Sequence, residues 1–444
     1  MKGVIYILKV WAVSVVALLV GCDLAEGGDN NGLAHNECEH TIVMYLNANN
    51  NLSHSLYQNA LDAEKGMVGA LPSTRLVIYL DKASETKLYE VRYLPYGSNE
   101  HIRYCKELKT YPTQTSTTPE VMKSVMEDVK ELAPSRSYGL VMAGHGTGWF
   151  PKPSSGTSYN DQKVAPQHRP EYYFHHTLEM PETRSMGYDY VDDENGTQII
   201  KPESYISTEE IVEGLSPIHF DYIIFDACFM SSVEFLYDLR NSADYIIASP
   251  VEILACGLPY KEVVENLATV RHDIGQVADI VMDVYMRDDN FSREKSLALA
   301  TIDCSKLEAL ADVVAEVYAS TGGGDCVQVI EDRVEKENVQ VLDRMSPAGF
   351  YDLADFVCEL TDDVALQTKF LEAMDELLLG VVHTDTIYSL GYDDWGYLSY
   401  DRISGENGAP LSLCGISTYI PHAEAPLTNQ LYQQTSWARK VYGN

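Results

Sequence analysis

The sequence predicts an α/β fold in which helices cover a mostly parallel sheet. Short apolar runs alternate with helical patterns as far as residue 303, which is typical of layered α/β proteins. Runs such as 138–143 and 222–225 lack the polar alternation of a half-exposed strand, so they suit strands that are buried on both faces. In addition, 45% of the 444 residues are hydrophobic, which is ample for a large core.

Each expected element rests on the period of its apolar residues. Strands are expected at 41–46, 76–80, 88–94, 138–143, 222–226, 244–248 and 297–302. Helices are expected at 119–132, 208–215, 232–240, 260–268 and 274–287. Beyond these, the pattern becomes helical at 305–318 and 352–378, and strand-like segments follow at 384–390 and 414–420. We therefore expect residues 304–444 to form a helical and mixed C-terminal elaboration, packed on a core of residues 40–303.

Two of the expected strands end in residues with complementary chemistry. One leads to His145 between Gly144 and Gly146, and the other leads to Cys228. Because reactive groups collect at the carboxyl ends of parallel strands, both side chains are expected at one edge of the sheet. A single buried cysteine or a single histidine is most often structural, but a matched pair favours a cysteine nucleophile with its base. A phosphate loop is disfavoured, because the glycine run lacks the Lys-Ser/Thr ending.

The N-terminus has the features of a secretory signal. Lys2 and Lys9 are basic, and residues 10–20 carry no charge. This run is too short to span a bilayer and fits the apolar core of a signal peptide. Leu-Val-Gly-Cys at 19–22 resembles a bacterial lipoprotein cleavage box. We expect 1–21 to be a signal peptide, Cys22 to carry the lipid, and 22–39 to be a polar tether; an ordinary cleaved signal or an uncleaved anchor is the alternative.

The composition restricts the partners. The chain has 66 acidic and 32 basic residues and a net charge of −34. This charge repels phosphate backbones, which argues against nucleic-acid binding, and it attracts basic peptides. The nine cysteines include no C-x-x-C pair, which argues against a structural zinc site.

The sequence indicates no certain cofactor. Adjacent side chains such as His175 and His176 point to opposite sides of an extended segment. The acidic cluster before Gly196 fails the EF-hand pattern, because a glycine at the sixth position puts Val191 first; it comprises Asp189, Asp192, Asp193 and Glu194. No metal ligand is assigned, and a solvated acidic loop is the favoured interpretation.

The motifs around His145 and Cys228 resemble those of the clostripain family of cysteine peptidases, in the clan of caspases, gingipains and legumains. The clan resemblance rests on a strand that ends in His-Gly and another that ends in Asp-Ala-Cys. The family resemblance covers roughly residues 40–421 and departs at 250–252 and at the insert 150–203. Its landmarks are Asn50-Asn51-Leu52, 144–149, 225–230 with Glu234, 248–249, 257–260, 352–353 and 415–421.

The resemblance implies a caspase-like three-layer α/β/α sandwich and a lipid-anchored cysteine endopeptidase of the bacterial cell envelope, periplasmic or at the cell surface. Cys228 is then the nucleophile and His145 the proton carrier, while the backbone amides of Gly146 and Cys228 form the oxyanion hole. Asp226 shares a strand face with Cys228, and the resemblance implies that it recognises Arg or Lys before the cleaved bond. Glu252 is a second candidate wall of that pocket. The resemblance also leaves calcium possible as a cofactor, with the acidic cluster before Gly196 as its candidate site.

Local motifs add two further expectations. Ser231-Ser232-Val233-Glu234 matches a capping box, whose helix N-terminus would favour the nearby thiolate. The insert 150–203 is a natural site for nicking, and members of the resembled family mature by cleavage between the two catalytic residues. Three of its five basic residues precede proline, which leaves Lys163 and Arg184 as candidate self-cleavage sites. A permanent lid is the alternative.

Two other functions remain open. One is a catalytically weak envelope lipoprotein that binds peptides or glycans on the same scaffold. The other is a peptidase of the same clan that cleaves after asparagine or small residues. The presence of both His145 and Cys228 favours the enzyme, whose partners would be basic peptide or protein substrates.

Overall fold

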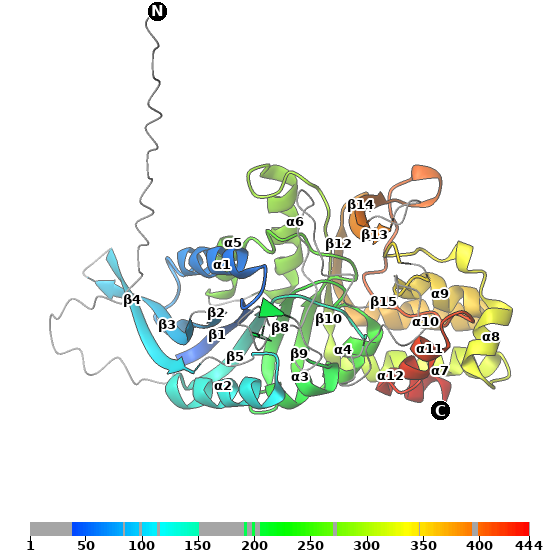
Figure 1. Cartoon of the computed structure of the whole chain (residues 1–444), viewed down its shortest axis with the longest axis horizontal. Helices are drawn as coiled ribbons and strands as arrows, with labels where there is room; N and C mark the ends of the chain where they lie inside the picture. The colour runs from blue at the N-terminus through cyan, green and yellow to red at the C-terminus, as the bar shows by residue number, and fades with distance from the viewer. Residues whose placement is uncertain are drawn as a thin grey trace, which may run out of the picture. The chain divides into compact units, whose positions relative to one another are not determined.

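A computed structural model describes most of the chain after the tether. The described residues are 38–82, 85–96, 100–112, 116–150, 191–192, 198–199, 205–269, 273–345, 347–392 and 398–443. At their centre lies a nine-stranded sheet of order β12-β10-β9-β8-β5-β1-β2-β3-β4 (Figure 1). Its strands are β1 (Cys38–Asn47), β2 (Thr74–Lys82), β3 (Glu85–Tyr96), β4 (Glu100–Tyr111), β5 (Ser135–Ala143), β8 (Phe220–Asp226), β9 (Ala243–Ala248), β10 (Ala298–Asp303) and β12 (Leu378–His383).

The sheet is mostly parallel, as expected. β2, β1, β5, β8 and β9 are joined by parallel pairings. β3 and β10 run against this direction, and β4 and β12 return to it through antiparallel pairings. The register places Val43 opposite Leu140 and Leu140 opposite Ile223. All three side chains are fully buried, because the sheet is covered on both faces.

Helices form the two outer layers. α1 (Ser53–Gly66), α5 (Tyr260–Leu267) and α6 (Val277–Arg287) lie on one face of the sheet, and α2 (Pro119–Leu132), α3 (Thr208–Leu215) and α4 (Val233–Leu239) lie on the other (Figure 1). α2 begins at the N-cap Thr118, whose hydroxyl accepts the Val121 amide, and it buries Met122, Val125 and Val129 against the sheet. The three-layer α/β/α fold class is thereby confirmed.

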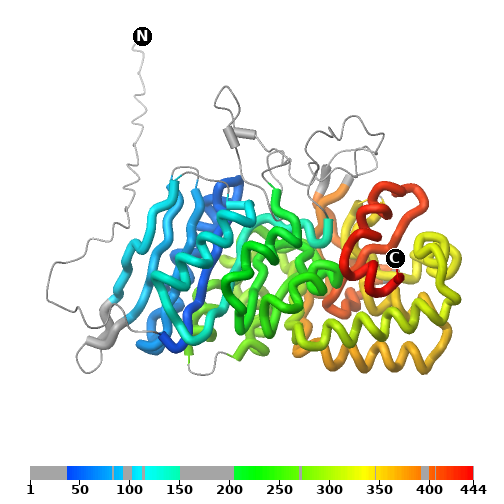
Figure 2. The backbone as a smooth tube through the Cα atoms, turned by 90° about the horizontal axis from the view of Figure 1, so that it is seen from below, coloured from blue at the N-terminus to red at the C-terminus, as the bar shows by residue number. Residues whose placement is uncertain are grey.

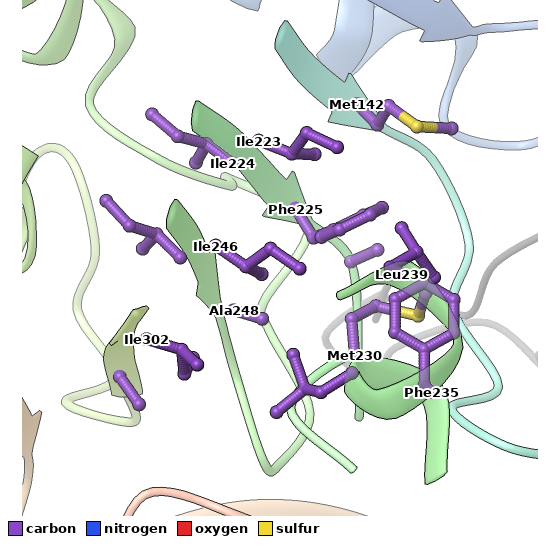
Figure 3. Close-up of a cluster of buried hydrophobic side chains, with 14 of the residues drawn as sticks. Met142, Ile223, Ile224, Phe225, Met230, Phe235, Leu239, Ile246, Ala248 and Ile302 are labelled. Carbon is purple, nitrogen blue, oxygen red and sulfur yellow. The ribbon is translucent and has the colours of Figure 1, made fainter. Parts of the chain in front are cut away.

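The core beneath the sheet's carboxyl edge joins β8, β9 and α4. Figure 3 shows Phe225 of β8 facing Phe235 of α4, and their ring centroids are 5.1 Å apart in an edge-to-face contact. Ile246 of β9 and Met230, which follows β8, lie in the same cluster (Figure 3). This packing fixes the end of β8, where the expected nucleophile lies.

The C-terminal region adds helices and short strand pairs, and its strand β12 extends the central sheet. Figure 2 shows α12 (Ser436–Tyr442, red) beside α7 (Leu307–Ser320), with which it packs. The remaining helices are α8 (Cys326–Arg333), α9 (Leu353–Leu360), α10 (Val364–Leu377) and α11 (Pro426–Tyr432). Its short strand pairs are β11 (Tyr351–Asp352) with β15 (Ser417–Thr418), and β13 (Ile387–Tyr392) with β14 (Leu398–Ile403). A further short pair, β6 (Val191–Asp192) with β7 (Gln198–Ile199), comes earlier in the chain, between β5 and β8.

Some expected elements differ from those observed. The helical stripe at 352–378 is two helices, because Asp352 and Asp363 each cap a new N-terminus with their carboxylates. The strand expected at 414–420 has only two residues, Ser417 and Thr418. α1, β4 and β12 were not expected. Across the described ranges, no helix is long and apolar enough to cross a membrane.

Candidate active site

The ends of β5 and β8 bring His145 and Cys228 into neighbouring loops. The two strands pair in parallel as far as Ala143 opposite Asp226, and each functional residue follows two positions later. The Gly144 amide donates to the Asp226 carbonyl at 3.4 Å. Both His145 and Cys228 are buried, each about 1% exposed. The sheet register alone therefore places the two loops side by side.

Gly146 is the point of closest approach between these loops. A Cβ atom added to Gly146 would lie 2.3 Å from the Cys228 carbonyl oxygen and 2.9 Å from the Cys228 nitrogen. Both distances are shorter than a van der Waals contact, so only glycine fits there. The two backbones expected to form the oxyanion hole therefore pack directly against each other.

His145 is oriented by Asn51, which belongs to the Asn-Asn-Leu turn after β1. Its Nε2 atom lies 2.6 Å from Asn51 Oδ1. Since an amide oxygen only accepts hydrogen bonds, Nε2 carries the proton and Nδ1 is left as the basic nitrogen. The turn is itself held by Asn50, which accepts the Leu52 amide and donates to the Asn47 carbonyl. The Asn-Asn-Leu motif was the only signal in the sequence for this contact.

The Cys228 sulfur lies against the loop that follows β9. Sγ accepts the Ile253 amide at 3.2 Å and lies 3.7 Å from the Ile253 carbonyl oxygen. This loop is joined to the cysteine turn by the Phe229 amide, which donates to the Val251 carbonyl at 3.0 Å. Ser249 stabilises the loop by bonding both backbone groups of Val251. The thiol is thus held in a defined position beneath residues 249–253.

The two candidate pocket acids have different surroundings. Asp226 is fully buried, and its Oδ2 accepts the Tyr260 hydroxyl at 2.6 Å and the Leu258 amide at 3.4 Å. It therefore lies at the start of α5, on the strand that leads to Cys228. Glu252 accepts hydrogen bonds from the β13–β14 hairpin instead, through Ser389 Oγ, the Leu390 amide and the Tyr400 hydroxyl. Its carboxylate fastens that hairpin to the loop over the thiol.

The expected capping box is wrong, although a helix does begin where it was expected. α4 has Ser232 as its N-cap, and no side chain caps it. The Ser231 hydroxyl donates to the Gly415 carbonyl at 2.7 Å instead. Glu234 accepts the Thr418 hydroxyl and the Tyr419 amide, and burial raises its pKa to about 7. Both side chains join the segment after Cys228 to the C-terminal region, a role that local spacing does not reveal.

Some residues considered in the sequence lie outside the described residues. They are the candidate lipidation and self-cleavage residues Cys22, Lys163 and Arg184, and five residues to which no metal role was assigned: His175, His176, Asp189, Asp193 and Glu194. Within the part of the chain that the structure describes, no group of three or more His, Cys, Asp or Glu side chains is arranged to hold a metal ion.

Comparison with known proteins gives one family match and several structures of similar fold. A model of the clostripain family matches residues 173–386, a segment that includes Cys228 but not His145. A secreted C11 cysteine protease from Bacteroides thetaiotaomicron, solved with an irreversible peptide inhibitor, is 24% identical with a TM-score of 0.69, and the alignment covers 91% of this chain and 98% of that one. An inactive zymogen C11 protease from Parabacteroides distasonis is 24% identical with a TM-score of 0.68, covering 92% and 99%. No curated protein matches the chain.

These findings agree with the arrangement of the described residues. The likeness to the solved structures extends over nearly the whole chain and concerns its fold. The family match is independent of that likeness and contains the end of β8. Residues 173–386 therefore match the clostripain family of cysteine peptidases, and the chain shares the fold of solved C11 proteases.

Proposed function

We propose that the chain is a cysteine endopeptidase in which Cys228 and His145 form a catalytic dyad. The observation that carries this proposal is the contact of Gly146 with the Cys228 backbone, which sets the histidine loop against the nucleophile. The Asn51 hydrogen bond adds support, because it leaves His145 Nδ1 as the basic atom. A histidine oriented by a third group, beside a thiol, is the usual arrangement of an activated nucleophile.

The reaction proceeds in two stages. The Cys228 thiolate attacks the peptide carbonyl carbon, and the developing oxyanion accepts hydrogen bonds from the Gly146 and Cys228 amides. Protonated His145 then gives its Nδ1 proton to the leaving amine as the C–N bond breaks and a thioester remains. Water, deprotonated by His145, attacks the thioester and releases the acid and the thiol. For the first stage, the substrate must displace the Ile253 amide from Sγ.

We propose cleavage after Arg or Lys, with Asp226 as the group that binds the cationic side chain. Asp226 lies two residues before the nucleophile on β8, and one of its oxygens accepts the Tyr260 hydroxyl. This bond keeps the carboxylate in place before substrate arrives. A buried carboxylate paired with a substrate cation discriminates by about 2 kcal/mol or more when one partner is lost. Glu252 remains the second candidate for lining this pocket. It acts through the β13–β14 hairpin, to which its carboxylate is hydrogen-bonded.

The proposed setting is the cell envelope. The solved relatives from Bacteroides are described as secreted, which supports export of this chain. The signal-like residues 1–21 and the box ending in Cys22 favour lipid anchoring, with 22–39 as tether, 40–303 as peptidase core and 304–444 as the elaboration. Labelling with radioactive palmitate tests this, since Cys22→Ser should abolish the label.

Hydrolysis of peptides that differ only in Arg, Lys or Leu before the cleaved bond tests the activity. Cys228→Ala should lose hydrolysis entirely, whereas Cys304→Ala should keep it. Cys304 is a matched control because it is a buried cysteine like Cys228: it is 3% exposed, and burial raises the pKa of its thiol to about 12. Full activity in Cys228→Ala would refute the proposal.

A second pair of variants tests specificity. Asp226→Ala should lower the preference for Arg over Leu by roughly 30-fold or more. Tyr260→Phe removes the hydroxyl that holds the carboxylate but keeps its charge, so the preference should fall by less than in Asp226→Ala. An unchanged preference in Asp226→Ala would show that this carboxylate is a structural group.

A further inference from the structure

The residue that follows the nucleophile has an unfavourable backbone conformation. Phe229 has φ of 60°, in the left-handed region, and among the described residues only Asn407 is a second non-glycine case. Bulky side chains rarely adopt this conformation, which persists only where surrounding contacts impose it. Such outliers cluster at functional sites. Some contact must therefore hold the turn that carries Cys228.

The C-terminal region provides that contact. The Phe229 ring stacks on Phe350, with centroids 4.2 Å apart and planes inclined by 5°. Phe229 and Phe350 are 3% and 1% exposed, so neither ring has room to move away. The Phe229 amide is held separately, by its bond to the Val251 carbonyl. Ring and amide together fix the turn.

Phe350 is itself fixed at its backbone. The buried carboxylate of Asp343 accepts the amides of Met345, Gly349 and Phe350 at 2.7, 2.8 and 2.7 Å. The Asp343 side chain thereby holds both ends of the turn 343–350. The Phe350 ring extends from the end of this turn toward the turn that carries Cys228.

The histidine loop packs on the same ring. A Cβ atom on Gly148 would lie 2.7 Å from Phe350 Cε1, and the Phe150 ring meets Phe350 edge-on at 5.5 Å. The Trp149 indole donates to the Gly349 carbonyl at 3.4 Å. One aromatic side chain from the C-terminal region thus contacts both loops that carry the expected catalytic residues.

We propose that Phe350 is a positioning residue of the dyad: it holds Phe229 in the left-handed conformation and so sets Cys228 Sγ relative to His145. This inference rests on the proposed function, because it explains how the dyad is kept in register. It gives the C-terminal elaboration a part in catalysis that does not involve contact with substrate.

Two substitutions of Phe229 separate backbone positioning from simple packing. Phe229→Ala and Phe229→Gly both delete the ring, but only glycine adopts φ of 60° without strain. If the ring serves to impose that φ, Phe229→Ala should lose more of kcat than Phe229→Gly, by about fivefold or more, which corresponds to ~1 kcal/mol in the activation barrier. Equal losses would mean that the ring only fills space, and would overturn the inference.

Substitution of Phe350 provides the direct test. Phe350→Ala should lower kcat by about 10- to 100-fold, since small misplacements of reacting groups have effects of that size, while KM changes little. Phe350→Tyr keeps the ring and should restore kcat to within a few-fold. The rate of Cys228 alkylation by iodoacetamide, followed against pH by mass spectrometry, should change in Phe350→Ala and be restored in Phe350→Tyr.

A control variant, Tyr318→Ala, and the Cys228→Ala variant distinguish failure of the positioning role from failure of the proposed function. Tyr318→Ala removes one member of an edge-to-face aromatic pair with Tyr442 in α7 and α12, so it should lower Tm without altering Cys228 alkylation. Unaltered alkylation and kcat in Phe350→Ala would refute the positioning role. Hydrolysis that persists in Cys228→Ala would refute the proposed function instead, whatever the Phe350 variants show.

Discussion

Gly146→Ala is the substitution whose effect the structure specifies most directly. The new Cβ would lie 2.3 Å from the Cys228 carbonyl oxygen, 2.9 Å from its nitrogen and 3.0 Å from Ala227 Cβ. An ordinary van der Waals contact begins near 3.4 Å, so the shortest contact falls short by 3.4 − 2.3 = 1.1 Å. The first two contacts are with backbone, which cannot rotate away as a flexible side chain would. The histidine and cysteine loops must therefore separate by about 1 Å.

This separation affects stability and catalysis to different degrees. Overpacking of this size typically costs about 1–3 kcal/mol in the free energy of unfolding. A misplacement of about 1 Å between reacting groups costs on the order of 100-fold in rate. We therefore expect kcat/KM to fall by about 100-fold, while the variant remains folded with a Tm lowered by several degrees.

The measurement combines steady-state hydrolysis of an Arg peptide with thermal unfolding followed by circular dichroism. Gly380→Ala in β12 is the matched control, because a Cβ there meets nothing within 4 Å; its kcat/KM should equal that of the wild type. If Gly146→Ala keeps its kcat/KM within about twofold, the loops are not in contact in the active enzyme, and the oxyanion hole assigned to Gly146 and Cys228 is wrong.

Three further predictions concern the buried acids, the histidine and the insert. Burial raises the pKa of Glu234 and of Asp343 to about 7, above the 4.5 and 3.8 of the unfolded chain, so the folded state binds these protons more tightly. Their stabilising contribution is complete below pH 4 and is lost as pH rises to about 7, by up to ~1.4 kcal/mol per pH unit for each group. The decline in the free energy of unfolding by urea between pH 5 and 7 should be shallower in Glu234→Gln, and an equal slope would contradict the assignment. Asn51→Ala should lower kcat and shift the lower limb of the pH–rate profile, because His145 loses the partner that orients it. An unshifted profile would show that Asn51 does not orient His145. Incubated wild-type protein should show new N-termini after Lys163 or Arg184 that Cys228→Ala lacks; an intact chain in both would exclude self-processing.

Much of the central sheet could be predicted because its signals are local. Strands that are buried on both faces are apolar at nearly every position, so the runs 138–143 and 222–225 predict strands from the sequence alone. Parallel strands also share one functional edge, and this rule predicts that His145 and Cys228 lie at the same edge, in neighbouring loops. Helix α2 was equally evident, because its buried positions recur at the helical period.

Elements whose signals are weak or ambiguous were not predicted correctly. Asp352 and Asp363 each had the chemistry of an N-cap, yet the apolar stripe that continues through them indicated one helix. The prediction of a capping box was wrong for a different reason. Ser231 and Glu234 had the right spacing, but partners about 184 residues away compete for them. A hydrogen bond to a distant segment leaves no trace in local spacing.

The sequence by itself thus determined the α/β architecture, the acidic character, the clostripain resemblance and the two residues at the strand ends, because each depends on composition or on short-range periodicity. Only the tertiary structure decided what surrounds those two residues. Asn51 reaches His145, Glu252 fastens the β13–β14 hairpin, and Phe350 stacks on the strained Phe229. Each contact joins residues that are far apart along the chain, and packing brings them together through side chains whose local patterns carry no information about the partner.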